Sequence, residues 1–395
     1  MKYRRFGRTE LQMPVITCGG MRFQQSWEDI DPKDLDAKGQ VNLEETVRYA
    51  FANGINHFET ARGYGSSEYQ LGFVLPTLPR DEIIVQTKVT PKDSEKEFLE
   101  AFEKSLKHLQ LDHVDLLGVH GINNLDLLDK TLNKGTLAAC RKLQDQGLAK
   151  FIGFSTHAGP ATVTKTVQTG EFDYVNLHWY YIDQCNWPAI LEAKDRDMGV
   201  FIISPCDKGG KLYDPPQKLV DLCNPLTPMG FNDLFCLSRD EVNTISIGAT
   251  RPTDFDAHLE ILPLFDSDPL GHITPILDRL QSEFSSVLGE EWMGCWDQGW
   301  PSADETPDEV PIYHLLRMYN LAKALDMVVF GKMRYNMVGT AEHWFPGVLL
   351  DKTDRKKLVA RVSEHPMAER VLEALQEGHD LLKGEEKKRL SESGS

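Results

Sequence analysis

The sequence predicts a (β/α)8 barrel of the TIM-barrel class of α/β folds, followed by a helical C-terminal extension. Eight short apolar, β-branched runs occur in the first 250 residues. The segments between these runs carry apolar residues at helical spacing, and after about residue 264 only helical patterns remain. Strands that are buried on both faces are near-continuously apolar, and repeated strand–helix alternation is typical of a closed parallel barrel.

The eight predicted strands are separated by segments long enough for helical crossovers. An open doubly wound sheet is the alternative, but it would need a G-x-G-x-x-G loop after an early strand, and the sequence has none. The predicted strands are Val15–Cys18, His57–Thr60, Ile83–Val89, Val114–His120, Phe151–Thr156, Tyr174–Trp179, Val200–Pro205 and Thr244–Ala249.

Helices are predicted from apolar residues three and four apart. In the barrel, one predicted helix begins near Leu43 and a second covers Phe98–Leu109. A third covers Leu125–Leu148, with a break near Gly135. The change of pattern suggests a barrel domain over residues 1–265 and a helical extension over 266–395, whose charged tail 383–395 is expected to be mobile. Helices in the extension are predicted over Ile273–Leu288, Ile312–Phe330 and Val359–Leu382.

Composition excludes several classes of function. The net charge of −17 argues against a nucleic-acid or anionic-membrane partner, because both need a basic face. No apolar run approaches the roughly 20 residues of a membrane span, and the charged N-terminus does not resemble a signal peptide. Seven scattered cysteines without a CxxC pair predict neither a disulfide framework nor a metal site. We therefore expect a cytoplasmic protein that acts on a small molecule.

Chemically active side chains follow three consecutive predicted strands. In parallel barrels the active site lies at the carboxyl ends of the strands. The second, third and fourth strands end near Glu59, Lys88 and His120, and Tyr64 lies five residues beyond Glu59. Each residue taken alone is more often structural, as an ion-pair member, a loop aromatic or a core histidine. Together, at successive strand ends, they indicate an active site.

These four residue types suit the reduction of a carbonyl group. Hydride addition leaves negative charge on oxygen, and a tyrosine can protonate that oxygen, although a free phenol has a pKa of about 10. An ammonium close to Tyr64 would lower this pKa, and Lys88 would itself need Glu59 as an anionic partner. His120 can hydrogen-bond the same oxygen and orient the carbonyl. The predicted roles are Tyr64 as acid, Lys88 as activator, Glu59 as its partner and His120 as orienter.

The segment from Gly54 to Glu68 reads GINHFETARGYGSSE and resembles the signature of the aldo-keto reductase family. The resemblance extends over about residues 1–262. It implies a carbonyl reductase using NADPH, in which the family's Asp-Tyr-Lys-His tetrad maps onto Glu59, Tyr64, Lys88 and His120. One departure is the acid, which is glutamate here and aspartate in the family.

The resemblance also implies cofactor contacts along the strand ends. Thr156 replaces the asparagine that follows the family's serine, and Ser204 replaces an aromatic residue that often stacks on the nicotinamide. Arg251 resembles the contact to the adenosine 2′-phosphate. The implied cofactor-binding residues are Gly20, Met21, Ser155, Thr156, Asn176, Ser204, Gly209, Lys211, Thr250 and Arg251.

The C-terminal third resembles the ferredoxin-like tail of one bacterial branch of the family, on the pattern of residues 310–317 and 320–324. That tail holds an iron–sulfur cluster, which needs about four cysteine thiolates. This chain has only Cys295 beyond Cys236, so we expect no iron–sulfur cluster.

Aromatic residues near the first and sixth strands are candidates for the wall of a carbonyl-binding pocket, although core packing explains them equally well. They are Phe23, Trp27, Trp179 and Tyr180. Two other functions stay open from the sequence. One is a cofactor-binding regulatory or scaffold protein on the same barrel, as in potassium-channel β-subunits, and the other is a barrel lyase or isomerase that works without nicotinamide.

Overall fold

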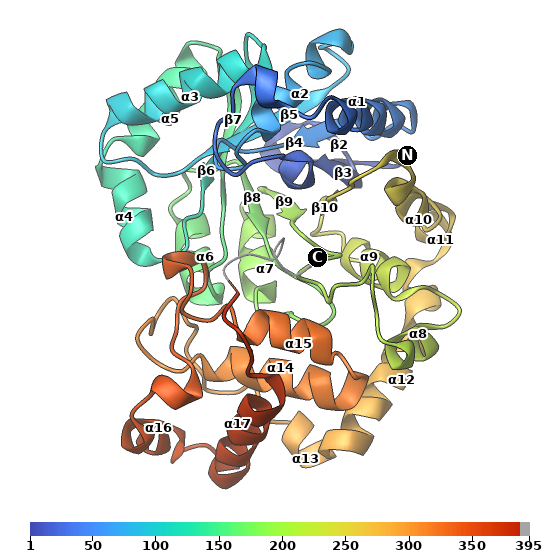
Figure 1. Cartoon of the computed structure of the whole chain (residues 1–395), viewed down its shortest axis with the longest axis vertical. Helices are drawn as coiled ribbons and strands as arrows, with labels where there is room; N and C mark the ends of the chain where they lie inside the picture. Colours follow the sequence, from blue (N-terminus) through green and yellow to red (C-terminus); the bar gives the residue numbers. More distant parts are fainter. Residues whose placement is uncertain (388–395) are drawn as a thin grey trace. The chain divides into compact units, whose positions relative to one another are not determined.

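The first of two compact units is a closed parallel barrel. The computed structural model describes residues 1–387 of the chain, and this unit comprises residues 1–209 and 232–270. Its strands are hydrogen-bonded in the order β10-β3-β4-β5-β6-β7-β8-β9 (Figure 1), which confirms the predicted (β/α)8 fold. The strands are β3 (Ile16–Gly19), β4 (His57–Glu59), β5 (Ile84–Val89), β6 (Val114–His120), β7 (Ala149–Ser155), β8 (Tyr174–Leu177), β9 (Gly199–Ile202) and β10 (Thr244–Ile247).

All eight strands lie where the sequence predicts them, with small differences at their ends. Strands β8 and β9 stop two and three residues early. Beyond β8 the backbone of Tyr180 pairs with that of Asp183, which closes a tight turn. Beyond β9 Ser204 has a φ of +55°, a left-handed conformation that an extended strand does not contain. Both strands therefore end in turns, in which the chain changes direction at the carboxyl face of the barrel.

Helices surround the strands, as the blue-to-green ribbons of Figure 1 show. Three of them begin at side-chain caps, where Asp36, Ser94 and Asn124 accept hydrogen bonds from the first turn. The break predicted near Gly135 is confirmed, because this glycine has a φ of +103° between two helices. These helices are α1 (Ala37–Ala52), α2 (Ser67–Leu71), α3 (Glu95–Leu109), α4 (Leu125–Asn133), α5 (Thr136–Asp145), α6 (Pro160–Gln168) and α7 (Trp187–Asp195).

A two-stranded hairpin packs against the amino ends of the barrel strands. It consists of β1 (Tyr3–Arg5) and β2 (Gln12–Pro14). Phe6 and Met13 are fully buried in one cluster with Ile84, Leu116 and Phe201, which lie on the strands. Because this apolar cluster fills the amino-terminal end, the polar strand ends at the opposite face are the place for a site.

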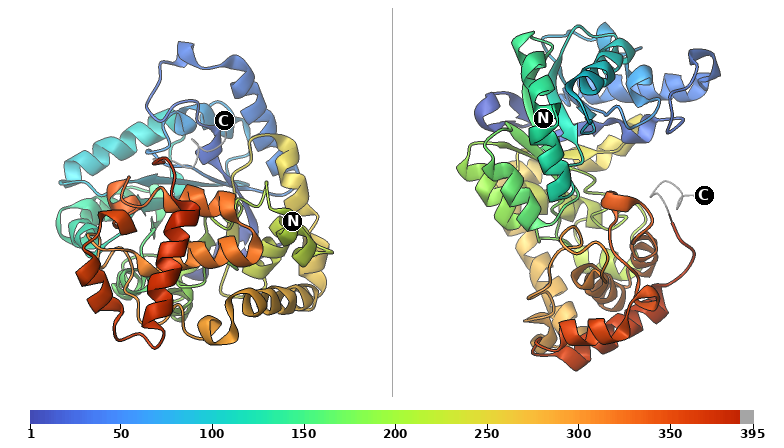
Figure 2. Two further views of the ribbon diagram at one scale, coloured as in Figure 1. Left: turned by 60° about the horizontal axis from the view of Figure 1, so that its bottom comes forward. Right: turned by 90° about the vertical axis from the view of Figure 1, so that its left-hand side faces the viewer.

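The second unit is helical and, within the described residues, comprises residues 210–231 and 271–387. Helix α14 packs against both α15 and α17, as Figure 2 also shows. The main helices are α8 (Gln217–Cys223), α12 (Pro269–Leu288), α14 (Ile312–Leu325), α15 (Val328–Tyr335), α16 (Arg355–Val362) and α17 (Ala368–Leu382). The chain passes from the second unit to the first between residues 231 and 232, within α9 (Pro228–Leu237).

The helices predicted for the extension are present, and two of them are divided. The predicted Ile312–Phe330 helix breaks at Asp326, which has a φ of +56° and ends α14. The predicted Val359–Leu382 helix divides into α16 and α17. None of the helices within residues 1–387 has the length and apolar character needed to cross a membrane.

The compact units differ from a division at residue 265 in two places: the first unit extends to residue 270, and residues 210–231 belong to the second unit. Residues 210–231 associate with the C-terminal helices, because Lys218 forms an ion pair with Glu283 at 2.7 Å and Arg279 donates to the Leu222 carbonyl at 2.9 Å. In the predicted tail, the Gly384 amide donates to Asn336 Oδ1 at 2.8 Å. Residues 388–395 lie outside the described part, so the division at 265 and the mobile tail stay proposals.

Candidate active site

The predicted catalytic side chains lie at the carboxyl ends of three neighbouring strands. Glu59 is the last residue of β4, Lys88 lies one residue before the end of β5, and His120 is the last residue of β6. Strands β4, β5 and β6 are consecutive in the closed sheet. All three side chains are buried. The barrel therefore brings together the acid, the amine and the imidazole that the sequence singles out.

Lys88 and Glu59 form a buried ion pair. The Lys88 Nζ donates to Glu59 Oε2 and to the carbonyl oxygen of Thr60, the latter at 2.8 Å. The second carboxylate oxygen, Oε1, accepts from Ser246 Oγ at 3.2 Å. The two charged side chains are only 2% and 5% exposed. Because a buried charge is costly unless it is paired, each of these two side chains serves as the counter-charge of the other.

Tyr64 lies beside this pair and His120. Its ring centroid is 4.9 Å from Lys88 Nζ and 5.5 Å from the centroid of the His120 ring, which meets it edge-on at 86°. Burial, and then the Glu59 carboxylate, raise the pKa of Tyr64 well above its ordinary value. From the sequence we expect Lys88 to lower this pKa, but Glu59 already balances the ammonium charge. The phenol therefore keeps its proton at neutral pH, as a proton donor must.

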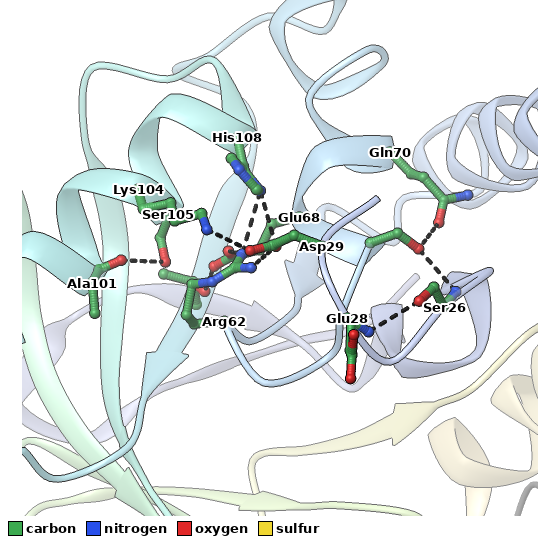
Figure 3. Close-up of polar contacts among 12 residues, drawn as sticks. Ser26, Glu28, Asp29, Arg62, Glu68, Gln70, Ala101, Lys104, Ser105 and His108 are labelled. Carbon is green, nitrogen blue, oxygen red and sulfur yellow. Dashed lines mark hydrogen bonds and ion pairs between the residues drawn. The ribbon is translucent and has the colours of Figure 1, made fainter. Parts of the chain in front are cut away.

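The turn that carries Tyr64 is fastened by a set of ion pairs (Figure 3). Arg62 contacts Asp29 and, at 2.5 Å, Glu68, and Asp29 also pairs with Lys104. The buried Glu68 accepts a further hydrogen bond from Thr87 at 2.5 Å. This explains the glutamate at the end of the signature segment, since it ties the turn after β4 to strand β5.

Gly65 allows the loop after β3 to approach this turn. It has a φ of +56°, and a Cβ atom at this position would lie 1.8 Å from the Ser26 carbonyl oxygen. The Ser66 amide in turn donates to that carbonyl at 3.1 Å. A side chain at residue 65 would thus displace the loop and the neighbouring Tyr64.

Ser155 and Asn176, two polar residues, lie level with His120 on the next two strands of the barrel. Strand register places His120 opposite Ser155 on β7, and Ser155 opposite Asn176 on β8. The Ser155 hydroxyl accepts from the Gly121 amide at 3.1 Å. Asn176 is fully buried, and neither atom of its amide forms a hydrogen bond within the described residues. Because buried amides are rarely left unsatisfied, Asn176 is suited to hold a polar ligand group.

The other predicted cofactor residues differ in their surroundings. Thr156 is buried and its hydroxyl donates to the Ile122 carbonyl at 2.7 Å. Arg251 is 71% exposed on its side chain, and its Nε is 2.9 Å from Asp254 Oδ1. The Thr250 hydroxyl donates to the same carboxylate at 2.7 Å. Arg251 is therefore held at one side of its guanidinium and otherwise faces solvent.

Glycines of the predicted cofactor set stand where the backbone is crowded. A Cβ on Gly20 would lie 2.7 Å from the Glu59 carbonyl oxygen, and one on Gly209 would lie 1.9 Å from the Pro205 carbonyl oxygen. Met21 follows Gly20 in a 3-10 turn and is partly exposed. Lys211 belongs to the second unit, where its Nζ bonds Asp214 Oδ2 at 2.7 Å.

The predicted pocket residues are mostly packed within the protein. Phe23, Trp179 and Tyr180 are buried, and Trp27 is partly exposed. Trp179 stacks on Phe235 with centroids 4.9 Å apart. The Tyr180 hydroxyl is 2.6 Å from His178 Nδ1. These contacts account for Trp179 and Tyr180 as packing residues, so their role as a substrate wall stays a prediction.

Sequence reasoning missed some residues that shape the site. Ser246 on β10 bonds the Glu59 carboxylate, and Asp29 and Arg62 anchor the Tyr64 turn. The only signal for Ser246 is its place in the alternation of β10, where an inward-facing serine follows Ile245. A charged residue in a surface loop, such as Asp29, carries no signal of its partner 33 residues away.

Comparison with known proteins places the chain among the aldo-keto reductases. The sequence profile of the aldo/keto reductase family matches residues 15–187. A D-threo-aldose 1-dehydrogenase from a Pseudomonas species is 30% identical over 272 residues, which cover 54% of this chain and 81% of that enzyme. This chain therefore belongs to the aldo/keto reductase family.

Other relatives match over a smaller share of their length. An L-galactose dehydrogenase from Arabidopsis thaliana is 32% identical over 222 residues, or 53% of this chain and 66% of the relative. The chain spans about half of an L-glyceraldehyde 3-phosphate reductase from Escherichia coli, which is 28% identical over 42% of this chain and 49% of its own. These matches agree with the family, and the two relatives act on different substrates by their names.

Solved structures confirm the fold. An aldo-keto reductase from Bacillus halodurans in its holo form superposes with a TM-score of 0.59 at 20% identity, covering 71% of this chain and 96% of the other. A Klebsiella pneumoniae aldo-keto reductase in complex with NADPH superposes with a TM-score of 0.54 at 17% identity, covering 66% and 89%. At these identities the likeness concerns the barrel.

Proposed function

We propose that this protein reduces an aldehyde or ketone to the alcohol with NADPH as hydride donor, and that Tyr64 is the general acid. The observation that carries the proposal is the contact of the Tyr64 ring with both the buried Lys88–Glu59 pair and His120. Membership of the aldo/keto reductase family supports the reaction class. The cofactor is NADPH alone, without an iron–sulfur cluster.

The residues of this chain can be assigned to the steps of the reaction. His120 orients the carbonyl oxygen by a hydrogen bond, and Tyr64 gives that oxygen its proton as negative charge develops there. Lys88, whose Nζ lies 4.9 Å from the ring centroid, attracts the negative charge that Tyr64 gains as it gives up its proton, and Glu59 is the counter-charge of Lys88. When bound, NADPH supplies the hydride.

The nicotinamide end of the cofactor fits the residues beyond His120. The unsatisfied amide of Asn176 offers both a donor and an acceptor, which match the two polar atoms of a carboxamide. Ser155 lies opposite it in register and provides a hydroxyl. The neutral, fully buried Asn176 is a better partner for an amide than for a charged group.

The proposal is tested by titrating NADPH into the protein and then mixing the complex with a panel of aldehydes and ketones. Consumption of NADPH in proportion to alcohol formed supports the proposal. Tight NADPH binding without turnover on the whole panel would instead favour a regulatory protein. Isomerisation or elimination without cofactor would favour a nicotinamide-independent enzyme.

Arg251 is proposed to contact the 2′-phosphate that distinguishes NADPH from NADH. Its exposed guanidinium, which is bonded through Nε to Asp254, can pair with a phosphate at low cost. Arg251→Ala is expected to weaken NADPH binding by roughly tenfold or more and to leave NADH binding nearly unchanged. Dissociation constants of both cofactors measure this. Equal losses for the two cofactors would assign Arg251 another role, and Arg239→Ala, on the same unit, is the matched control.

Two substitutions of Glu59 distinguish the role of its negative charge from the role of its side-chain length. Glu59→Asp restores the family's acid, and activity is expected to equal or exceed that of the parent because the shorter carboxylate still pairs with Lys88. Glu59→Gln leaves the buried Lys88 ammonium without a counter-charge, so both activity and stability are expected to fall. Steady-state kcat/KM and thermal unfolding of both variants test this. An inactive aspartate variant beside an active glutamine variant would contradict the assigned pairing.

A further inference from the structure

A cysteine, a histidine and an aspartate that the proposed reduction does not use lie together in the barrel unit. Cys206 follows β9, Asp233 lies on α9 and His258 on the short helix α10 (Asp256–Leu259). Their sulfur, nitrogen and oxygen atoms all lie within 4.8 Å of one another. Asp233 and His258 are buried, whereas Cys206 is partly exposed.

The three side chains are arranged as a chain of contacts. His258 Nε2 lies 3.7 Å from the sulfur of Cys206, and its other ring nitrogen, Nδ1, bonds Oδ2 of Asp233. The second oxygen of Asp233, Oδ1, forms no hydrogen bond within the described residues, so His258 is the partner to which this carboxylate is directed. Thiol, imidazole and carboxylate in this order are the parts of an activated cysteine nucleophile.

The groups around the sulfur act on it in opposite directions. Burial by itself would lower the pKa of His258, but the Asp233 carboxylate raises it well above its ordinary value. The pKa of Cys206 is raised, mainly by burial; His258 opposes this rise, and the carboxylates of Asp233 and Asp207 add to it. An imidazolium 3.7 Å from sulfur stabilises the thiolate, which is the form that attacks electrophiles.

A metal site is the competing use of these residues. The three residues offer one possible ligand atom each, but Nδ1 of His258 is already bonded to Oδ2 of Asp233. Three ligands are fewer than the four of a structural zinc site, and the bond that is present directs the Asp233 carboxylate at the imidazole ring and not at the sulfur. The contacts therefore fit a nucleophile better than a metal centre.

We propose that Cys206, His258 and Asp233 form a thiol-reactive site that adds α,β-unsaturated carbonyl compounds covalently. The Cys206 sulfur forms a bond to the β-carbon, the carbon–carbon π bond breaks, and its electrons move to the carbonyl oxygen as an enolate. The proton released by the thiol goes to the solvent. His258 then gives a proton from Nε2 to the α-carbon and regains one from the solvent. The net change is addition of S–H across the double bond, so no oxidant or reductant takes part.

The other cysteines of the chain serve as internal references. Cys18, Cys140, Cys223 and Cys236 are buried, and burial raises the pKa of each thiol. Cys295 is partly exposed like Cys206, but it donates to the Glu291 carbonyl at 3.2 Å, and burial and neighbouring acids raise its pKa. Burial raises the pKa of Cys206 as well, so the contact with the His258 imidazole is the feature that distinguishes it from Cys295.

The experiment is alkylation of the native full chain with substoichiometric N-ethylmaleimide, with adducts at each cysteine quantified over time by peptide mass spectrometry. Cys206 is expected to react about tenfold or more faster than Cys295 and the partly exposed Cys185. The fast phase should disappear in Cys206→Ser and persist in Cys295→Ser. Reaction at Cys295 or Cys185 as fast as at Cys206 would overturn the proposal.

Two substitutions test the roles of the histidine and the aspartate. His258→Asn and the isosteric Asp233→Asn should each slow alkylation of Cys206 by about tenfold and shift its rate–pH profile to higher pH. Circular dichroism and the unchanged rate at Cys295 establish that each variant is folded. If one variant unfolds, the other decides the question, together with the pH profile of the parent protein. An unchanged Cys206 rate in a folded variant would show that exposure alone controls this thiol.

Discussion

Tyr64→Phe is expected to lower the kcat/KM for carbonyl reduction by roughly 10²- to 10⁴-fold, the usual contribution of a positioned proton donor. The substitution removes one hydroxyl and little volume, so the ring can keep its contacts with Lys88 and His120. Because burial and Glu59 raise the pKa of Tyr64 well above its ordinary value, the parent enzyme should stay active as the pH rises, until the phenol loses its proton. The variant should lack this alkaline limb.

The fold and cofactor affinity of Tyr64→Phe should match those of the parent chain, since the hydroxyl is proposed to face the substrate oxygen. Tyr69→Phe is the matched control. Tyr69 is a neighbouring tyrosine whose ring contacts Phe73 and His108, and its loss of a hydroxyl should leave turnover unchanged. Full turnover by Tyr64→Phe with every carbonyl tested would remove Tyr64 from the mechanism.

Lys88→Met is expected to cost a similar factor. It removes the ammonium that stabilises a negative charge on Tyr64, and the Lys88 Nζ lies 4.9 Å from the ring centroid. The double variant Tyr64→Phe/Lys88→Met should be little slower than either single variant, because residues that act as one unit are not additive. Steady-state kinetics on all three variants test this. Independent, multiplying losses would mean that Lys88 acts apart from Tyr64.

Stability has to be separated from catalysis in the lysine variant. Removing one partner of a buried ion pair typically costs about 3–5 kcal/mol, because the other charge stays buried. Glu59 would then keep only the Ser246 hydroxyl as a partner. Combining Lys88→Met with Glu59→Gln removes both charges and should restore much of the free energy of unfolding while activity stays low. Recovered activity in this pair would show that the lysine acts only on the fold.

The barrel could be predicted from the sequence because buried parallel strands have a composition of their own. Val114–His120 has an apolar residue or glycine at every position except Asp115 and His120, and the structure gives β6 the same bounds. The ends of β8 and β9 could not be predicted, since the turn at Tyr180 and the left-handed Ser204 depend on packing of the following loops. The helix break at Gly135 could be predicted, because glycine favours the backbone conformation found between the two helices.

The candidate site could be predicted as a set of residues but not as a network. Strand ends carry Glu59, Lys88 and His120, and their meeting follows from the barrel. The direction of the Tyr64 pKa could not be predicted, because it depends on how completely Glu59 neutralises Lys88 and on how deeply the phenol is enclosed. The association of residues 210–231 with the C-terminal helices likewise depends on pairs, such as Lys218 with Glu283, that have no sequence signature.

The Cys206–His258–Asp233 cluster illustrates the same limit. Its members are separated by 27 and 25 residues along the chain, without any motif spacing. The seven scattered cysteines predict neither a disulfide framework nor a metal site, and nothing in their spacing singles out Cys206. Only the fold shows that one partly exposed cysteine faces an imidazole.

The most direct test of the proposed reaction is isotope transfer from the cofactor. NADPH carrying deuterium at C4 of the nicotinamide is incubated with the protein and a reactive aldehyde, and the alcohol is analysed by mass spectrometry. We predict one deuterium on the former carbonyl carbon, from one of the two C4 epimers only, and a greatly reduced yield with Tyr64→Phe. Tight cofactor binding without deuterium in the product of any carbonyl tested would contradict the proposed hydride transfer.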